Sequence, residues 1–246
     1  MTTKWVSLIG VVLLFVAVFG INPWATSNRG KDVLSYAHTE LETGVYRAGN
    51  GIMVVKALTR MPDVEPEMVR WWFADYMQTT EHYQRWYPTQ HLWMDWENKL
   101  PGEHIGASHL VDEYIGDTIN KLRIQFVEPS EILTGYEETD DRFVICARGG
   151  SREALINANK MCHIVTKTEY GSEMRSVFWM GYIETRDPDN QNDTLWSIQS
   201  LLGNTALVRA LTFDKHSALA LMDHAIGEMN ILAGFLPELY ETETNL

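Results

Sequence analysis

Residues 214–240 read DKHSALALMDHAIGEMNILAGFLPELY, and this stretch decides the fold. It predicts one long helix with apolar side chains almost all round. These are Leu219, Leu221, Ala225, Ile226, Met229, Leu232 and Phe235. A helix that is apolar on most sides is buried on more than one side. Other parts of the chain must therefore wrap around it.

The segments upstream are short and rich in β-branched or aromatic residues, which is typical of strands. They are residues 104–114, 121–127, 142–147, 159–168 and 173–183, with a hairpin turn at 170–172 between the last two. Further upstream, Pro66 begins a predicted amphipathic helix that runs to His82. Helices and strands segregated in this way predict an α+β domain. We expect a curved antiparallel sheet of four to six strands around the C-terminal helix, with a ligand cavity between them.

The N-terminus carries an apolar run, residues 5–21, in which Ser7 is the only polar member. Its length fits an uncleaved membrane anchor, which we favour, or a cleaved export signal; a buried core helix is the third reading. We therefore expect a membrane-anchored or exported protein, with the topology left open. The predicted organisation is a signal or anchor segment over 1–27, an extended lead-in over 28–62 and one folded domain over 63–246.

Charge and cysteine content exclude several classes of function. The 20 basic and 33 acidic residues give a net charge of -13, which excludes nucleic acid as a main partner because such binding needs a basic surface. Cys146 and Cys162 are too few for a zinc site made of cysteines alone. We expect them to be small buried hydrophobic residues, or one disulfide if the compartment is oxidising.

The strongest local signal for chemistry is the pair His224 and Glu228. They are four residues apart and so share one face of the predicted helix. An ionisable pair in an apolar stripe is costly unless it is paired or bound to a metal. Both side chains can reach one metal ion, or they form a structural hydrogen bond. Further ligands would come from His82, His91, His104, His109, Glu113 or His163.

Several motifs occur in the order found in one known family. They are RWWF at 70–73, Tyr83, WYPTQH at 86–91 and Trp96, then GASHLVDEYIG at 106–116, EMRSVFW at 173–179, HAIGEM at 224–229 and FLPELY at 235–240. Together they cover about residues 65–240 and resemble the 2,4-diacetylphloroglucinol hydrolase family, which includes phloretin hydrolase. The resemblance implies a helix-grip fold, a homodimer and one zinc ion held by two His and two Glu. It also implies hydrolysis of a carbon–carbon bond between an acyl group and a phenolic ring.

The resemblance implies metal-binding and catalytic roles for the residues of this chain that match the family motifs. The metal ligands would be His224, Glu228, Glu113 and His91, with His82 as the alternative to His91. The implied catalytic residues are Tyr83, which would hydrogen-bond a substrate phenol, and the nearby histidines His109 and His163.

Two positions depart from the family pattern. Thr166 stands where a further His is expected, and Ser176 follows Arg175 where a second Arg is usual. These differences concern the substrate more than the metal.

The sequence therefore favours a zinc-dependent hydrolase of a small aromatic ketone, an acylated phenol or a related β-diketone. The phenol next to the acyl group would tautomerise to a ketone, and attack by water would expel a stabilised enolate. The alternative is a non-enzymatic helix-grip carrier of an apolar aromatic or lipid ligand. A third reading, a structural or interaction protein of the cell envelope, predicts neither cavity nor metal.

Overall fold

The computed structural model describes residues 33–187, 193–194 and 197–245. Its strands are β1 (Gly44–Arg47), β2 (Met53–Pro62), β3 (His91–Glu97), β4 (Ser108–Ile115), β5 (Thr118–Val127), β6 (Arg142–Ser151), β7 (Ile156–Thr168), β8 (Gly171–Arg186) and β9 (Asp193–Thr194). Its helices are α2 (Pro66–Trp71), η1 (Trp72–Tyr76), α3 (Thr80–Trp86), η2 (Pro129–Glu131), α4 (Ile198–Gly203), α5 (Ala206–Thr212) and α6 (Lys215–Thr244). The predicted anchor over residues 5–21 lies outside the described part.

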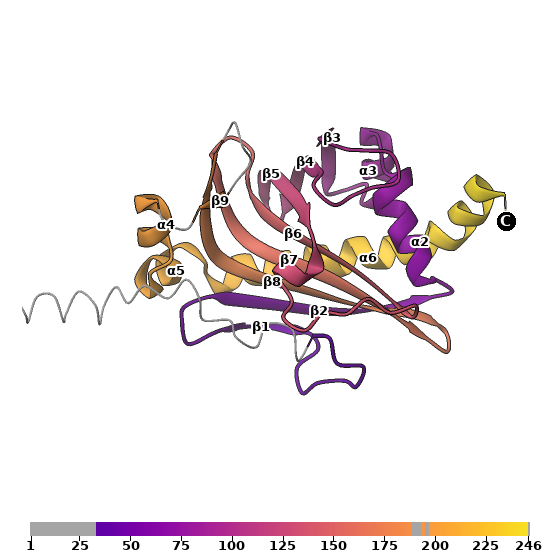
Figure 1. The fold of residues 1–246 in the computed structure, drawn as a ribbon, viewed down its shortest axis with the longest axis horizontal. Coiled ribbons are helices and arrows are strands. Elements are labelled where there is room, and N and C mark those ends of the chain that lie inside the picture. Colours follow the sequence, from indigo (N-terminus) through magenta and orange to yellow (C-terminus); the bar gives the residue numbers. More distant parts are fainter. Residues whose placement is uncertain (1–32, 188–192, 195–196, 246) are drawn as a thin grey trace, which may run out of the picture.

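All described strands form one antiparallel sheet in the order β1-β2-β8-β7-β6-β5-β4-β3, with β9 beside β8. The sheet curves around α6, and α2 and α3 lie toward the C-terminal part of that helix (Figure 1). The predicted α+β architecture, with a curved sheet around a long C-terminal helix, is confirmed. The sheet is larger than the four to six strands expected.

Helix α6 buries residues along one side from Ala218 to Leu239, whereas several apolar residues expected to be buried, among them Leu219 and Ile226, are only partly buried. Asp214 caps it by accepting a hydrogen bond from the Ser217 amide at 2.8 Å. Ala218 and Ala225 pack against the sheet, whereas Met229, Leu232, Leu236 and Leu239 pack into a cluster rich in aromatic residues. Among the described helices, α6 alone could cross a bilayer by length and composition, a property that the core helix of a folded domain shares.

The prediction of one helix from Pro66 to His82 is wrong. The chain forms α2, passes through the π-helical turn η1 and leaves the helix at Met77, where ψ is 89°. Thr79 then begins α3, because its side chain accepts a hydrogen bond from the His82 amide. This new N-terminus lets α3 continue to Trp86.

Residues 44–62, expected within an extended lead-in, form β1 and β2. Strand β2 pairs with β8 along its whole length, so it is an internal strand of the sheet. Its first three residues, Met53, Val54 and Val55, are all buried. From Val55 to Pro62 the burial alternates, but the buried face carries Thr59 and the outer face carries Leu58, so the sequence lacks a clean apolar–polar alternation.

Cys146 and Cys162 are buried, as expected, and they form a disulfide. The two residues face each other across β6 and β7, with their Cα atoms 4.1 Å apart. The sequence left open two free buried cysteines or one disulfide, and the structure shows the disulfide.

Two glycines of α6 have different surroundings and provide a matched test of its packing. A Cβ on Gly227 would meet the ring of Tyr87, whose Cζ lies 2.8 Å away, whereas no described atom lies within 4 Å of a Cβ on Gly234. We predict that Gly234→Ala raises the free energy of unfolding by about 0.5–1 kcal/mol, because Ala favours helix. Gly227→Ala will bring no such gain, because displacing Tyr87 costs about 1–3 kcal/mol. Chemical denaturation measures both; equal stabilisation would contradict the packing.

Candidate metal centre

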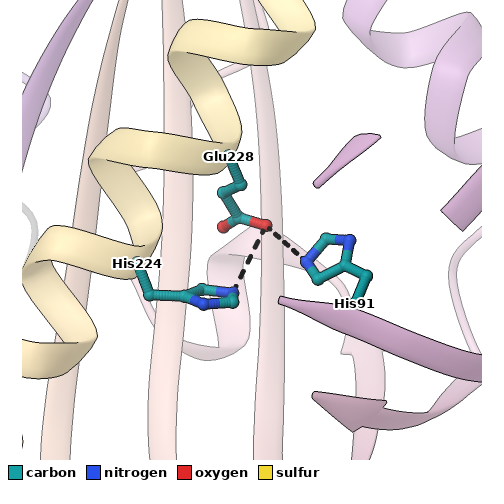
Figure 2. Close-up of side chains that lie close together, drawn as sticks. All are labelled: His91, His224 and Glu228. Carbon is teal, nitrogen blue, oxygen red and sulfur yellow. Dashed lines mark ion pairs between the residues drawn. The ribbon is translucent and has the colours of Figure 1, made fainter. Parts of the chain in front are cut away.

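Four ionisable side chains from three elements meet between α6 and one edge of the sheet. His91 begins β3 and is paired in register with Glu113 of β4. His224 and Glu228 lie one turn apart on α6 and point toward His91 (Figure 2). All four are at least nine-tenths buried. The structure thus brings together the four residues for which the resemblance implies metal binding.

The distances within this group suit a small cation. The Nε2 atom of His91 lies 3.6 Å from Oε2 of Glu228 and 3.9 Å from Oε2 of Glu113. The Nε2 atom of His224 lies 3.8 Å from Oε2 of Glu113 and 3.9 Å from Oε2 of Glu228. Ligand atoms placed about 2.0–2.2 Å from a zinc ion are about 3.3–3.6 Å apart at the corners of a tetrahedron. A small contraction would therefore complete such a site.

Hydrogen bonding sets the tautomer of His91. Its Nδ1 lies 2.9 Å from the backbone oxygen of Tyr83, which can only accept, so Nδ1 carries the hydrogen. In the neutral ring, Nε2 then presents a lone pair toward carboxylate oxygens. This atom is buried and has no hydrogen-bond partner among the described residues. Two electron-rich atoms face each other in this way only if a proton or a metal ion lies between them.

The pKa shifts in this group also indicate that a proton or a cation must lie among the four side chains. Burial raises the pKa of Glu228 to about 8; His224 opposes this shift and Glu113 adds to it. Burial also lowers the pKa of His91, although Glu113 opposes the shift. The protein alone would thus hold a proton on Glu228 at neutral pH, whereas a divalent cation would keep it ionised. Neutral imidazole and carboxylate are the ligand forms that zinc takes.

Tyr83 positions two of the four side chains. Its hydroxyl donates a hydrogen bond to Oε2 of Glu113, and its ring stacks on His91 with centroids 3.7 Å apart. Burial, together with Glu113, raises the pKa of Tyr83 well above its ordinary value, so the hydroxyl keeps its hydrogen. The indole of Trp86 holds α6 in place by donating to the backbone oxygen of Glu228 at 3.0 Å.

The alternative ligand His82 lies outside this group. Its Nδ1 contacts the backbone oxygen of Tyr76 at 2.8 Å, and its ring stacks on the Tyr76 ring. His104 is buried, but it lines a different hollow, beside α2 and η2. His82 lies on α3, whereas His91 begins β3 and is paired with Glu113 of β4.

A cavity of about 410 Å³ is lined by three of the four side chains, Glu113, His224 and Glu228. Its lining is mainly apolar and includes Phe73, Trp86, Leu122, Ile124, Phe126, Met161 and Phe178. His109 and His163, both predicted as catalytic, also line it. Burial lowers the pKa of His109 to about 3, with His91 adding to the shift, and burial lowers that of His163 to about 4. Both rings are therefore neutral at neutral pH.

The two cavity histidines have different partners. Nδ1 of His163 lies 2.7 Å from the hydroxyl of Ser176. His109 stacks on Trp96, and its buried Nε2 has no partner among the described residues. His109 thus has a polar atom available to a ligand.

Sequence reasoning missed Asn159, which also lines the cavity. Its amide lies over Gly149 on the neighbouring strand, where a Cβ would meet it. The pair Gly149-Gly150, just after the predicted strand 142–147 and inside the observed β6, was the available signal, because glycine within a strand marks close approach by another group.

Three known proteins are similar to this chain. A 2,4-diacetylphloroglucinol hydrolase from a Pseudomonas species is 23% identical over 218 residues, which is 81% of this chain and 70% of that protein. Phloretin hydrolase from Eubacterium ramulus is 25% identical over 214 residues, 80% of this chain and 70% of that protein. The crystal structure of the di-domain ARO/CYC StfQ from the steffimycin biosynthetic pathway has a TM-score of 0.45 at 14% identity, covering 78% of this chain and 52% of that chain.

The family model described as the DAPG hydrolase PhiG domain matches residues 25–241. This match spans most of the chain and includes all four side chains of the candidate metal centre. The chain therefore belongs to the DAPG hydrolase family.

Proposed function

We propose that this chain is a zinc-dependent hydrolase that cleaves the carbon–carbon bond between an acyl group and a phenolic ring, or the same bond in a related β-diketone. The observation that carries the proposal is the buried group of two imidazoles and two carboxylates at one end of an apolar cavity. The names of its relatives, 2,4-diacetylphloroglucinol hydrolase and phloretin hydrolase, support the choice of substrate class.

The residues that would hold the metal are His91, Glu113, His224 and Glu228. Their donor set of nitrogen and oxygen atoms suits zinc, and sulfur does not take part because both cysteines are in the disulfide. A bound zinc ion would supply Lewis-acid polarisation of the acyl carbonyl or lower the pKa of a water molecule.

The cavity suits a small aromatic ketone. Its volume of about 410 Å³ lies in the range of small-molecule sites, roughly 300–1,000 Å³. Aromatic and aliphatic side chains would pack against the ring. His109 and His163 place polar atoms on this lining, where they can hydrogen-bond phenolic oxygens.

The side chains that line the cavity would also stabilise the charge that develops during the proposed hydrolysis. In the proposed reaction the bond from ring carbon to acyl carbon breaks, water supplies a hydroxyl to the acyl carbon, and the ring carbon receives a proton. The products are a carboxylic acid and the deacylated phenol. Because His109 and His163 are neutral, they would hold the developing oxygen charge by N–H donation rather than as imidazolium ions.

A homodimer and an N-terminal anchor remain predictions within this proposal. The disulfide between Cys146 and Cys162 supports an oxidising location for the folded domain, since disulfides are rare in reducing compartments.

Turnover tests the proposal against the carrier alternative. We predict that the purified full chain releases acetate from 2,4-diacetylphloroglucinol, and that a chelator or His224→Ala reduces release to the level without enzyme. Glu238→Ala is the matched control, because Glu238 lies on the same helix but is exposed. Chromatographic detection of the acid measures the rate. Uptake of the ligand without acid release, unaffected by chelator, would instead identify a carrier.

The hydroxyl of Tyr83 provides a second test. Tyr83→Phe keeps the ring on His91 but removes the hydrogen bond to Glu113. We predict a loss of about 10–100-fold in activity or in metal affinity, as for other groups that orient metal ligands. Tyr76→Phe is the control, because Tyr76 belongs to the same aromatic region and does not line the cavity. Equal activity of the two variants would exclude this role for Tyr83.

A further inference from the structure

The two short helices α4 and α5 expose an apolar surface. Ile198 and Leu202 of α4 are 73% and 51% exposed, and Leu207 and Leu211 of α5 are 37% and 77% exposed. Each pair is four residues apart and so lies on one face of its helix. Both helices lie at the end of the molecule where α6 begins (Figure 1). We call these four residues the leucine surface.

This surface carries no exposed charge. From Ser197 to Phe213 the only ionisable residue is Arg209, and its side chain is fully buried. The protein as a whole has a net charge of -13, so a stretch of this length without an exposed charged group is unusual for its surface. Water is a poor environment for such a surface.

Arg209 of α5 and Asn204, between the two helices, are buried instead. Arg209 donates to the backbone oxygens of Gly181 and Asn50 at 2.8 Å and 2.9 Å, and to the side-chain oxygen of Asn204 at 2.8 Å. Asn204 in turn donates to the backbone oxygen of Ile183 at 2.7 Å. These hydrogen bonds fix the helices against β8 and the turn before β2. The apolar side chains therefore face outward on a rigid support.

We propose that the leucine surface rests on a lipid bilayer. The same chain carries the apolar run 5–21, whose composition fits insertion into a membrane. The eleven residues between Ile21 and Val33 can span up to about 40 Å, which is enough to let the domain lie on the membrane beside an inserted segment. An uncharged surface of this kind suits contact with the headgroup and upper acyl region of a neutral lipid such as phosphatidylcholine.

The cavity opens beside this surface. Among its lining residues, the exposed ones are Gly116, Asp117, Thr118, His216 and Ser217. They belong to the β4–β5 turn and the first turn of α6, and α6 follows α5 after only two residues. Docking would therefore place the cavity entrance near the membrane, where apolar aromatic compounds concentrate.

Depth-dependent quenching tests this docking. The full chain with Leu211→Cys, labelled with an environment-sensitive fluorophore, would be reconstituted into phosphatidylcholine vesicles that carry bromine either high or low on the acyl chains. The native cysteines are in a disulfide and do not compete for the label. We expect strong quenching by the high bromines and weaker quenching by the low ones, since docked side chains reach about 5–10 Å into the boundary region.

Leu100 supplies the matched control. It is 65% exposed but follows the edge strand β3, whereas α4 packs against β8. A label at Leu100→Cys should be quenched several-fold less. Adding Leu202→Glu should remove quenching at position 211, and adding Leu100→Glu should not. Equal quenching at both positions would overturn the proposal. A label at 211 that is shielded but not quenched would also overturn it, because a second copy or residues 5–21 would then cover the surface.

Discussion

Two imidazoles and two carboxyl groups face one another inside an apolar interior, and the rest of the structure is arranged around this contact. Carboxylates in such a place are costly without a cation, as the raised pKa of Glu228 shows. The fold nevertheless fixes the group from several sides. Tyr83 holds Glu113 and sets the His91 ring, and Trp86 ties its indole to α6 at Glu228. Such support from surrounding side chains is typical of a metal site, where neighbours orient each ligand.

The geometry also joins the site to the curved sheet. Helix α6 supplies His224 and Glu228 from its centre, while its ends pack against the sheet and the aromatic cluster. Strands β3 and β4 place His91 opposite Glu113 through a shift of register between His91 and Trp93. One face of the group therefore comes from local helix spacing and the other from long-range strand pairing. The apolar cavity between them follows from the curvature that the sheet needs to surround a helix.

The pattern of α6 predicted the long helix, its burial and the pair His224 and Glu228, because helix periodicity is a local property of the sequence. The sequence did not reveal β2, since Thr59 lies on its buried face and Leu58 on its outer face, which breaks the apolar–polar alternation. It also did not show that one helix ends at Tyr76 and another begins after Thr79, with His82 held against the backbone oxygen of Tyr76 and outside the group. Only a resemblance selected Glu113 and His91 from the six candidate ligands, because residues 22 positions apart meet only through strand pairing.

The most direct measurement is X-ray absorption at the zinc edge, made on the full chain purified with zinc. The account predicts one zinc ion per chain with four nitrogen or oxygen ligands at about 2.0–2.2 Å. It also predicts that His224→Ala abolishes this signal, while the exposed residue Glu238 can be changed to Ala without effect. A chain that retains no zinc, or a spectrum that is unchanged in His224→Ala, would contradict the assignment of this group as the metal centre.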